Sequence, residues 1–210
     1  MTNIFNGCYL LKTIDVSRWV VTLPTSFGAI FNACASVEEL DLSGFDSTNV
    51  TSFSSMFSGC TNLKSLDLSH FNTSKVTTMY YMFNACRNLE HLDVSHFDTS
   101  KVTDFRCMFQ YTINLKELDI SNFSFESAIY INSFCWNTSA RIKSLPLISN
   151  LTSGRVTSSY ADYAFGYMMS LQEMDLTGFD LSGVTAPSYV FRYNYSMEKC
   201  ILPVSLHYIA

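Results

Sequence analysis

The chain has 210 residues, of which 48% are hydrophobic and 15% are charged, and its formal net charge at pH 7 is −5. This apolar content excludes a disordered chain, and the acidic balance leaves no basic surface for nucleic acid. No run of 18 apolar residues is present, and the N-terminus lacks the basic-then-apolar pattern of a secretion signal, so we expect no membrane insertion.

A regular repeat runs along the chain, with a phenylalanine at one fixed position of each copy. The period is 26, as from Phe57 to Phe83, and it holds throughout except for one interval of 25 and one of 31. The marker phenylalanines are Phe5, Phe31, Phe57, Phe83, Phe109, Phe134, Phe165 and Phe191. Such a period predicts a solenoid, in which each repeat buries its apolar side against its neighbours. We therefore expect one domain over residues 1–210 with about 7–8 rungs, a partial first repeat and an irregular repeat at 134–164.

Each repeat contains a Leu-Asp-Leu triplet that predicts a short parallel strand. In the copy at 66–68 the leucines alternate with polar residues, which is the period of a strand with one buried face. In the repeat 134–164 the triplet is replaced by Leu145-Pro146-Leu147. Because proline lacks an N–H donor, we expect a disturbed sheet at that rung. A last strand near 200–206 is expected to close the array.

The segment after the strand has the spacing of a short helix. Phe53, Met56, Phe57 and Cys60 follow the i, i+3, i+4, i+7 pattern of a helix with one apolar face. Gly59 suits the end of this helix. The preceding threonines, which are predicted N-caps, are Thr51, Thr77 and Thr103. The predicted fold is therefore a right-handed α/β repeat solenoid of the leucine-rich-repeat kind, with one short parallel strand and one short helix per repeat.

Two columns of residues are predicted to belong to the core. Four of the seven cysteines lie three residues after a marker phenylalanine, which favours buried free thiols over disulfides. They are Cys8, Cys34, Cys60 and Cys86. The second column is aromatic and consists of Trp19, Phe45, Phe71, Phe97, Phe123 and Phe179. Since these columns account for their residues, no cofactor is implied.

The aspartates of the triplets form a ladder of like charges on adjacent strands, which lie about 4.8 Å apart. The ladder comprises Asp15, Asp41, Asp67, Asp93, Asp119 and Asp175. Neighbouring serines and backbone N–H groups can satisfy these carboxylates, or cations can bind along them. Weak candidates for a metal site are Asp67, His70, Asp93 and His96, but their spacing matches no zinc motif, and no metal is predicted. The chain also has no catalytic motif, so we expect no enzyme.

The copies differ most at the outward positions around each marker phenylalanine, where Tyr, Trp and Arg replace the Lys and Glu of ordinary surfaces. These residue types dominate binding hot spots. The predicted partner-binding residues are Tyr80, Tyr81, Arg106, Tyr111, Trp136, Tyr163, Tyr167, Tyr189, Arg192, Tyr193 and Tyr195. The alternative is that these tyrosines pack laterally against one another.

The repeat pattern LDLSxFDTSxVTxMxxMFxxCxxL resembles the BspA-like leucine-rich-repeat surface proteins of bacteria and some protists. The resemblance covers about residues 4 to 202. It implies an extracellular or cell-surface protein that adheres to a protein or glycoprotein partner without catalysis. The alternative is a structural component that stacks end to end through its open first rung.

Overall fold

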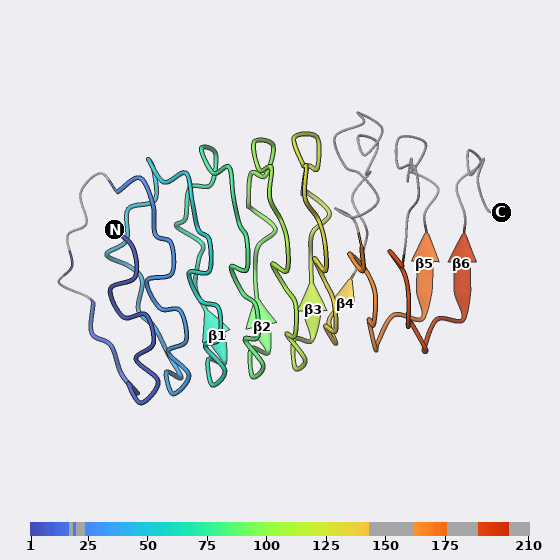
Figure 1. Ribbon diagram of the computed structural model, residues 1–210, viewed down its shortest axis with the longest axis horizontal. Helices are drawn as coiled ribbons and strands as arrows, with labels where there is room; N and C mark the ends of the chain where they lie inside the picture. The colour runs from blue at the N-terminus through green and yellow to red at the C-terminus, as the bar shows by residue number, and fades with distance from the viewer. Residues whose placement is uncertain (17–18, 20–23, 143–161, 176–188, 202–210) are drawn as a thin grey trace.

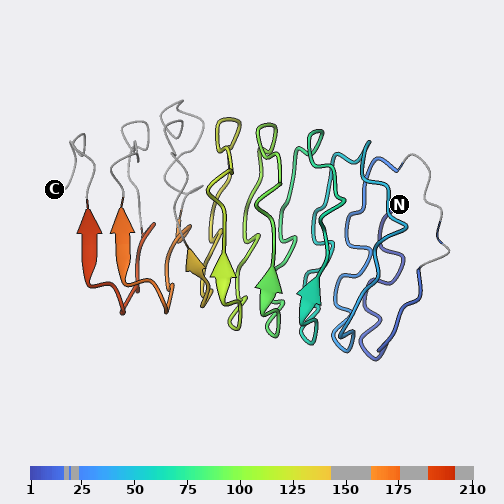
Figure 2. The ribbon, with the colours of Figure 1, turned by 180° about the vertical axis from the view of Figure 1, so that it is seen from behind.

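The computed structural model describes residues 1–16, 19, 24–142, 162–175 and 189–201. The chain forms a row of similar rungs that follow one another from the N-terminal to the C-terminal end (Figure 1). The described residues contain six short strands, which all point the same way, as the view from behind also shows (Figure 2). They are β1 (Ser65–Leu66), β2 (His91–Leu92), β3 (Glu117–Leu118), β4 (Arg141–Ile142), β5 (Glu173–Asp175) and β6 (Lys199–Ile201).

The strands pair in parallel as β1 with β2, β3 with β4 and β5 with β6. Leu66 lies opposite Leu92, and Leu118 lies opposite Ile142. β1 to β3 end at the first residue of the predicted triplet, two residues earlier than predicted, so that Asp67, for example, follows its strand. The strand of the irregular repeat is β4, which precedes the Leu145–Leu147 segment that we predicted in this role. That segment, Phe179 and the end of the predicted closing strand lie outside the described residues.

The predicted helices are wrong, because the described residues contain no helix. In the segment 53–60, every second N–H group donates to a carbonyl of the next rung. Examples are Ser55 N to Tyr80 O at 2.7 Å and Phe57 N to Met82 O at 3.0 Å. The N–H groups between them close turns within the rung, as Ser58 N does on Ser55 O. We call this segment of each rung the turn ribbon.

The turn ribbon gives the same i, i+3, i+4, i+7 spacing of buried residues as a helix with one apolar face. Its side chains point inward in pairs and outward in pairs, so Phe53, Met56, Phe57 and Cys60 are all fully buried. The predicted N-caps have another role as well. The Thr77 hydroxyl lies 3.2 Å from the Thr51 carbonyl of the preceding rung, and the threonines thus form a ladder between rungs.

The register also differs from the sequence prediction at Phe134. Phe83 N donates to Met108 O, and Phe109 N donates to Phe134 O in the same way. Phe134 therefore occupies the column of Met108, while Cys135, one full repeat after Phe109, occupies the marker column. The regular period is thus retained here, and the extra length of the irregular repeat falls between Cys135 and Phe165.

Stacked aromatic rings fill the core. The marker rings from Phe5 to Phe109 follow one another at centroid distances of 5.6–5.9 Å, with planes within 9°. Phe134 stands at 78° to Phe109, as expected for a ring from the neighbouring column. All seven cysteines are free. The Cys86 thiol donates to the Phe57 carbonyl of the preceding rung at 3.1 Å.

Candidate recognition edge

Four side chains of each turn ribbon point outward. Two of them belong to the residues three and two positions before the residue in the marker column. The other two belong to the residues one and two positions after it. In the first three rungs these residues are small, as in Gly28, Ala29, Ser54 and Ser55. From Tyr80 onward they include large aromatic residues in each rung, such as Tyr81, Tyr111 and Trp136. We call the outward turn-ribbon surface from Tyr80 to Tyr195 the aromatic edge.

Many tyrosines of the aromatic edge have a left-handed backbone. Two columns of each turn ribbon, two positions before and two after the marker, have positive φ values because the turns require them. Glycine occupies this conformation at Gly7 and Gly59. Bulky residues rarely do, at a cost of about 1–2 kcal/mol each. The tyrosines with φ between 57° and 67° are Tyr81, Tyr111, Tyr163, Tyr167, Tyr189 and Tyr193.

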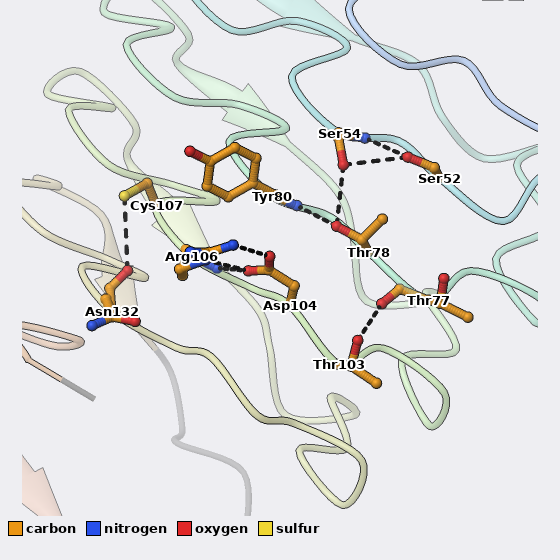
Figure 3. A network of polar contacts seen from close by, with 10 residues as sticks. All are labelled: Ser52, Ser54, Thr77, Thr78, Tyr80, Thr103, Asp104, Arg106, Cys107 and Asn132. Atoms are coloured by element: carbon orange, nitrogen blue, oxygen red, sulfur yellow. Dashed lines mark hydrogen bonds and ion pairs between the residues drawn. The ribbon is translucent and has the colours of Figure 1, made fainter. Parts of the chain in front are cut away.

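The first part of the aromatic edge is centred on Arg106 (Figure 3). The guanidinium carbon lies 4.7 Å from the ring centroid of Tyr80 and 4.6 Å from that of Tyr130. The Nε and Nη2 atoms donate to Oδ1 and Oδ2 of Asp104, at 3.0 and 2.6 Å. This ion pair raises the pKa of Arg106, so the group is charged and locally neutralised. Tyr80 also packs edge-on against Tyr81 at 4.3 Å.

The second part is an aromatic cluster around Trp136. The indole contacts Tyr163 at 4.7 Å, Tyr167 at 5.5 Å and Tyr193 at 6.1 Å between ring centroids. Tyr163 stacks on Tyr189 at 5.3 Å. Exposure increases toward the last rung, where Tyr189, Tyr193 and Tyr195 are 50%, 37% and 71% exposed. We call these six residues the C-terminal aromatic cluster.

Two arginines of the aromatic edge have no acidic partner among the described residues. Arg192 is exposed, and its guanidinium carbon lies 4.4 Å from the centroids of both Tyr189 and Tyr193. Arg87 is exposed and lies 5.6 Å from the single ring of Tyr111. One carboxylate oxygen of Asp162 is buried without a hydrogen-bond partner.

The structure thus brings most of the predicted site residues into two groups. Tyr111 is in neither group, and its ring lies 5.6 Å from the guanidinium carbon of Arg87. In the irregular rung, Ile131 and Cys135 point inward and are fully buried, while Asn132, Ser133 and Trp136 are partly exposed. Sequence reasoning missed Asp104 and Tyr130, the partners of Arg106. Thr78, Asp104 and Tyr130 follow one another at intervals of one repeat and form one column of bridges. This regular spacing was the sequence signal that could have placed Asp104 and Tyr130 together.

The aspartate ladder lies beside the strands, and backbone N–H groups donate to the carboxylates of Asp41, Asp67, Asp93 and Asp119. Oδ1 of Asp67 accepts the backbone N–H of Ser69 at 3.0 Å, and Asp93 and Asp119 do the same with the serine two residues on. Hydrogen bonds from the serine hydroxyl, and secondly from its N–H, hold the pKa values of Asp67 and Asp93 below the usual range. The structural explanation of the ladder therefore accounts for these side chains without a cation.

Two histidines beside the aspartate ladder also have partners in the backbone. Nε2 of His70 lies 3.0 Å from the Leu42 carbonyl, and Nε2 of His96 lies 3.0 Å from the Leu68 carbonyl. No group of three His, Cys, Asp or Glu side chains within the described ranges is arranged to hold a metal ion. A shallow hollow of about 520 Å³ lies over β2 and β3, lined by His91, Asp93, Lys116, Glu117 and Asp119 among others.

No helix in the part of the chain that the structure describes is long and apolar enough to cross a membrane.

Two family models match the chain. One is described as "BspA type Leucine rich repeat region (6 copies)" and matches residues 105–210. The other is described as "Mycoplasma protein of unknown function, DUF285" and matches residues 1–65 and 25–146. The comparisons with curated proteins and with solved structures give no significant match.

Proposed function

Because the chain belongs to the family of BspA-type leucine-rich-repeat proteins, we propose that it is a non-catalytic module that binds a protein or glycoprotein at a cell surface. Such repeat proteins are generally surface-associated. The proposed contact surface is the aromatic edge, and within it the C-terminal aromatic cluster. The proposed role is adhesion, with no cofactor.

The observation that carries the proposal is the placement of tyrosine at left-handed positions. At these positions glycine costs the least backbone energy, and the columns do contain glycine at Gly7 and Gly59. Tyrosine there costs about 1–2 kcal/mol of backbone energy. Strained residues of this kind concentrate at functional sites.

Exposure separates two roles among these residues. Tyr80, Tyr81, Tyr163 and Tyr167 are half-buried against their neighbours, which agrees with lateral packing. Tyr189, Tyr193 and Tyr195 keep much of their ring surface open, and rigid, amphipathic rings of this kind contribute strongly to protein interfaces. We therefore assign the contact to the last rungs. The packed tyrosines hold the exposed rings of these rungs in place.

A binding screen against extracellular-matrix proteins, host-cell surfaces and bacterial cells tests this function. The decisive variant replaces Tyr189, Tyr193 and Tyr195 with serine. The matched control is Tyr9→Ser, because Tyr9 is 62% exposed on the first rung and lies outside the aromatic edge. We expect the triple variant to lose at least tenfold in affinity and the control to lose little. Full binding by the triple variant would refute the assignment.

A second candidate function, end-to-end self-assembly, has one observation in its favour. Ile4, Tyr9 and Leu10 of the first rung are 42%, 62% and 88% exposed. Sedimentation over a range of concentrations tests it. Assembly predicts a dimer that Leu10→Glu abolishes, whereas a monomer at all concentrations excludes it.

A further inference from the structure

Arg106 and Arg192 are two versions of one arrangement, an arginine shared between two tyrosine rings. The guanidinium carbon lies 4.6–4.7 Å from the rings of Tyr80 and Tyr130 in the first case. It lies 4.4 Å from the rings of Tyr189 and Tyr193 in the second. In both, the aromatic rings stabilise the cation and restrict the long side chain.

The two arginines differ in what their N–H groups contact. Nε and Nη2 of Arg106 hold both oxygens of Asp104 in a bidentate pair (Figure 3). Arg192 is exposed, and none of the ion pairs among the described residues includes it. The described part of the chain therefore contains a Tyr–Arg–Tyr unit with its carboxylate and a Tyr–Arg–Tyr unit whose arginine is exposed.

We infer that Arg192, flanked by Tyr189 and Tyr193, binds a carboxylate supplied by the partner, namely an Asp or Glu side chain of a protein. The inference rests on the proposed function, since it specifies the chemistry recognised by the same cluster. The planar guanidinium presents paired donors that match a carboxylate, and the two rings hold it in place before the partner arrives. The pair at Arg106 and Asp104 shows the geometry that such a unit adopts.

The surroundings of Arg192 favour a protein as the source of the carboxylate. Trp136 and the tyrosines of the cluster offer flat apolar area near Arg192, and interfaces between proteins are enriched in Tyr, Trp and Arg. Hot spots are enriched in Trp, Tyr and Arg and are surrounded by contacts that exclude water. We therefore expect an acidic side chain at the centre of the partner's contact surface.

The test measures binding of the full chain to immobilised poly-L-glutamate, with polygalacturonate as the sugar-borne carboxylate and poly-L-lysine as the negative control. The variants are Arg192→Gln, Arg192→Lys and Arg87→Gln. Arg87→Gln is matched to Arg192→Gln in charge, since both arginines are exposed, but Arg87 lies over only one ring. Partners found in the binding screen are tested with the same variants before and after amidation of their carboxylates.

We expect Arg192→Gln to weaken poly-L-glutamate binding about tenfold or more, as for loss of a bidentate charged pair. Arg192→Lys is expected to be nearly as weak, because an ammonium cannot form the paired contact. Equal losses in Arg87→Gln and Arg192→Gln would mean that only net charge matters, and binding to polygalacturonate alone would place the carboxylate on a sugar. Either result overturns the inference.

The same experiments separate this inference from the proposed function. If the tyrosine variants lose a screened partner while Arg192→Gln and amidation have no effect, the edge binds but does not recognise a carboxylate. If the tyrosine variants keep that partner, the proposed function itself fails.

Discussion

The indole of Trp136 lies directly on Gly166 of the next rung. A Cβ atom added to Gly166 would lie 2.7 Å from Cζ3 of Trp136 and 2.9 Å from the backbone oxygen of Arg192. That oxygen accepts the N–H of Tyr167 at 2.8 Å, so it cannot move without loss of a bond between rungs. The absence of a side chain at Gly166 thus positions the indole at the centre of the C-terminal aromatic cluster.

We predict that Gly166→Ala displaces Trp136 and lowers the free energy of unfolding by about 1–3 kcal/mol, as overpacking does. The measurement is urea unfolding followed by the fluorescence of Trp136 in a Trp19→Phe background. Gly28→Ala is the control, because the nearest atom to its new Cβ is the side-chain oxygen of Ser26 at 3.3 Å. Equal stability of the Gly166 and Gly28 variants would contradict the close packing of the indole.

The backbone strain at Tyr189 leads to a second prediction. Its φ is 64°, a value that glycine adopts freely and that β-branched residues resist most. Tyr189→Gly and Tyr189→Val remove the same ring, so both are expected to weaken partner binding alike. The free energy of unfolding of the valine variant is expected to be about 1–2 kcal/mol lower than that of the glycine variant. Urea unfolding measures the difference, and a valine variant as stable as the glycine variant would show that the residue is not left-handed.

The cysteine column leads to a third prediction. Burial raises the pKa of Cys86 to about 12, so this thiol stays protonated and donates to the Phe57 carbonyl. Thr112 and Thr138 stand in the same column of the two following rungs, where they are fully buried and hydrogen-bonded to each other. We therefore expect Cys86→Thr to be tolerated. Valine has the same shape as threonine but no donor, so Cys86→Val is expected to be less stable than the threonine variant by about 1 kcal/mol or more. Identical unfolding curves for the two variants would exclude a role for the donor.

Much of the fold follows from the sequence because the repeat is long and nearly exact. The period predicts the rungs, the alternation around Leu66 predicts β1, and the spacing of Cys34, Cys60 and Cys86 predicts free buried thiols. Handedness and the single domain over 1–210 stay predictions. The helix prediction failed because a turn ribbon with paired inward residues has the same i, i+3, i+4, i+7 pattern. Only bonds to the next rung distinguish the two, and those bonds are not local in sequence.

The misplaced register at Phe134 has a similar origin. A phenylalanine one position early resembles a shortened repeat, whereas Thr112 and Thr138, which are one full repeat apart, preserve the true spacing. The aromatic edge was found because copies of one repeat can be compared within the chain. Its division into packed and exposed tyrosines was not predictable, since the αL backbone sets the direction of each ring.

The aspartate ladder makes stability depend on pH in a direction that tests its explanation. Hydrogen bonds from Ser69 and Ser95 hold the folded-state pKa values of Asp67 and Asp93 below those of the unfolded chain. Their contribution is therefore present above the unfolded value, about pH 4, and is lost as the pH falls through the folded value. Repulsion between neighbouring carboxylates would have the opposite sign, because protonation would then stabilise the folded chain.

We predict that wild-type protein loses stability between pH 5 and pH 3 more steeply than a variant with Asp67, Asp93 and Asp119 replaced by asparagine. Asparagine keeps an acceptor for the serine N–H but does not titrate in this range. Urea unfolding at each pH measures the two slopes, and NMR titration of the Asp93 carboxyl group measures its pKa directly. In Ser95→Ala this pKa is expected to rise, because the hydroxyl that donates to Asp93 at 2.7 Å is removed while the N–H remains. A wild-type protein that becomes more stable than the asparagine variant as the pH falls would show that repulsion along the ladder exceeds its hydrogen bonds.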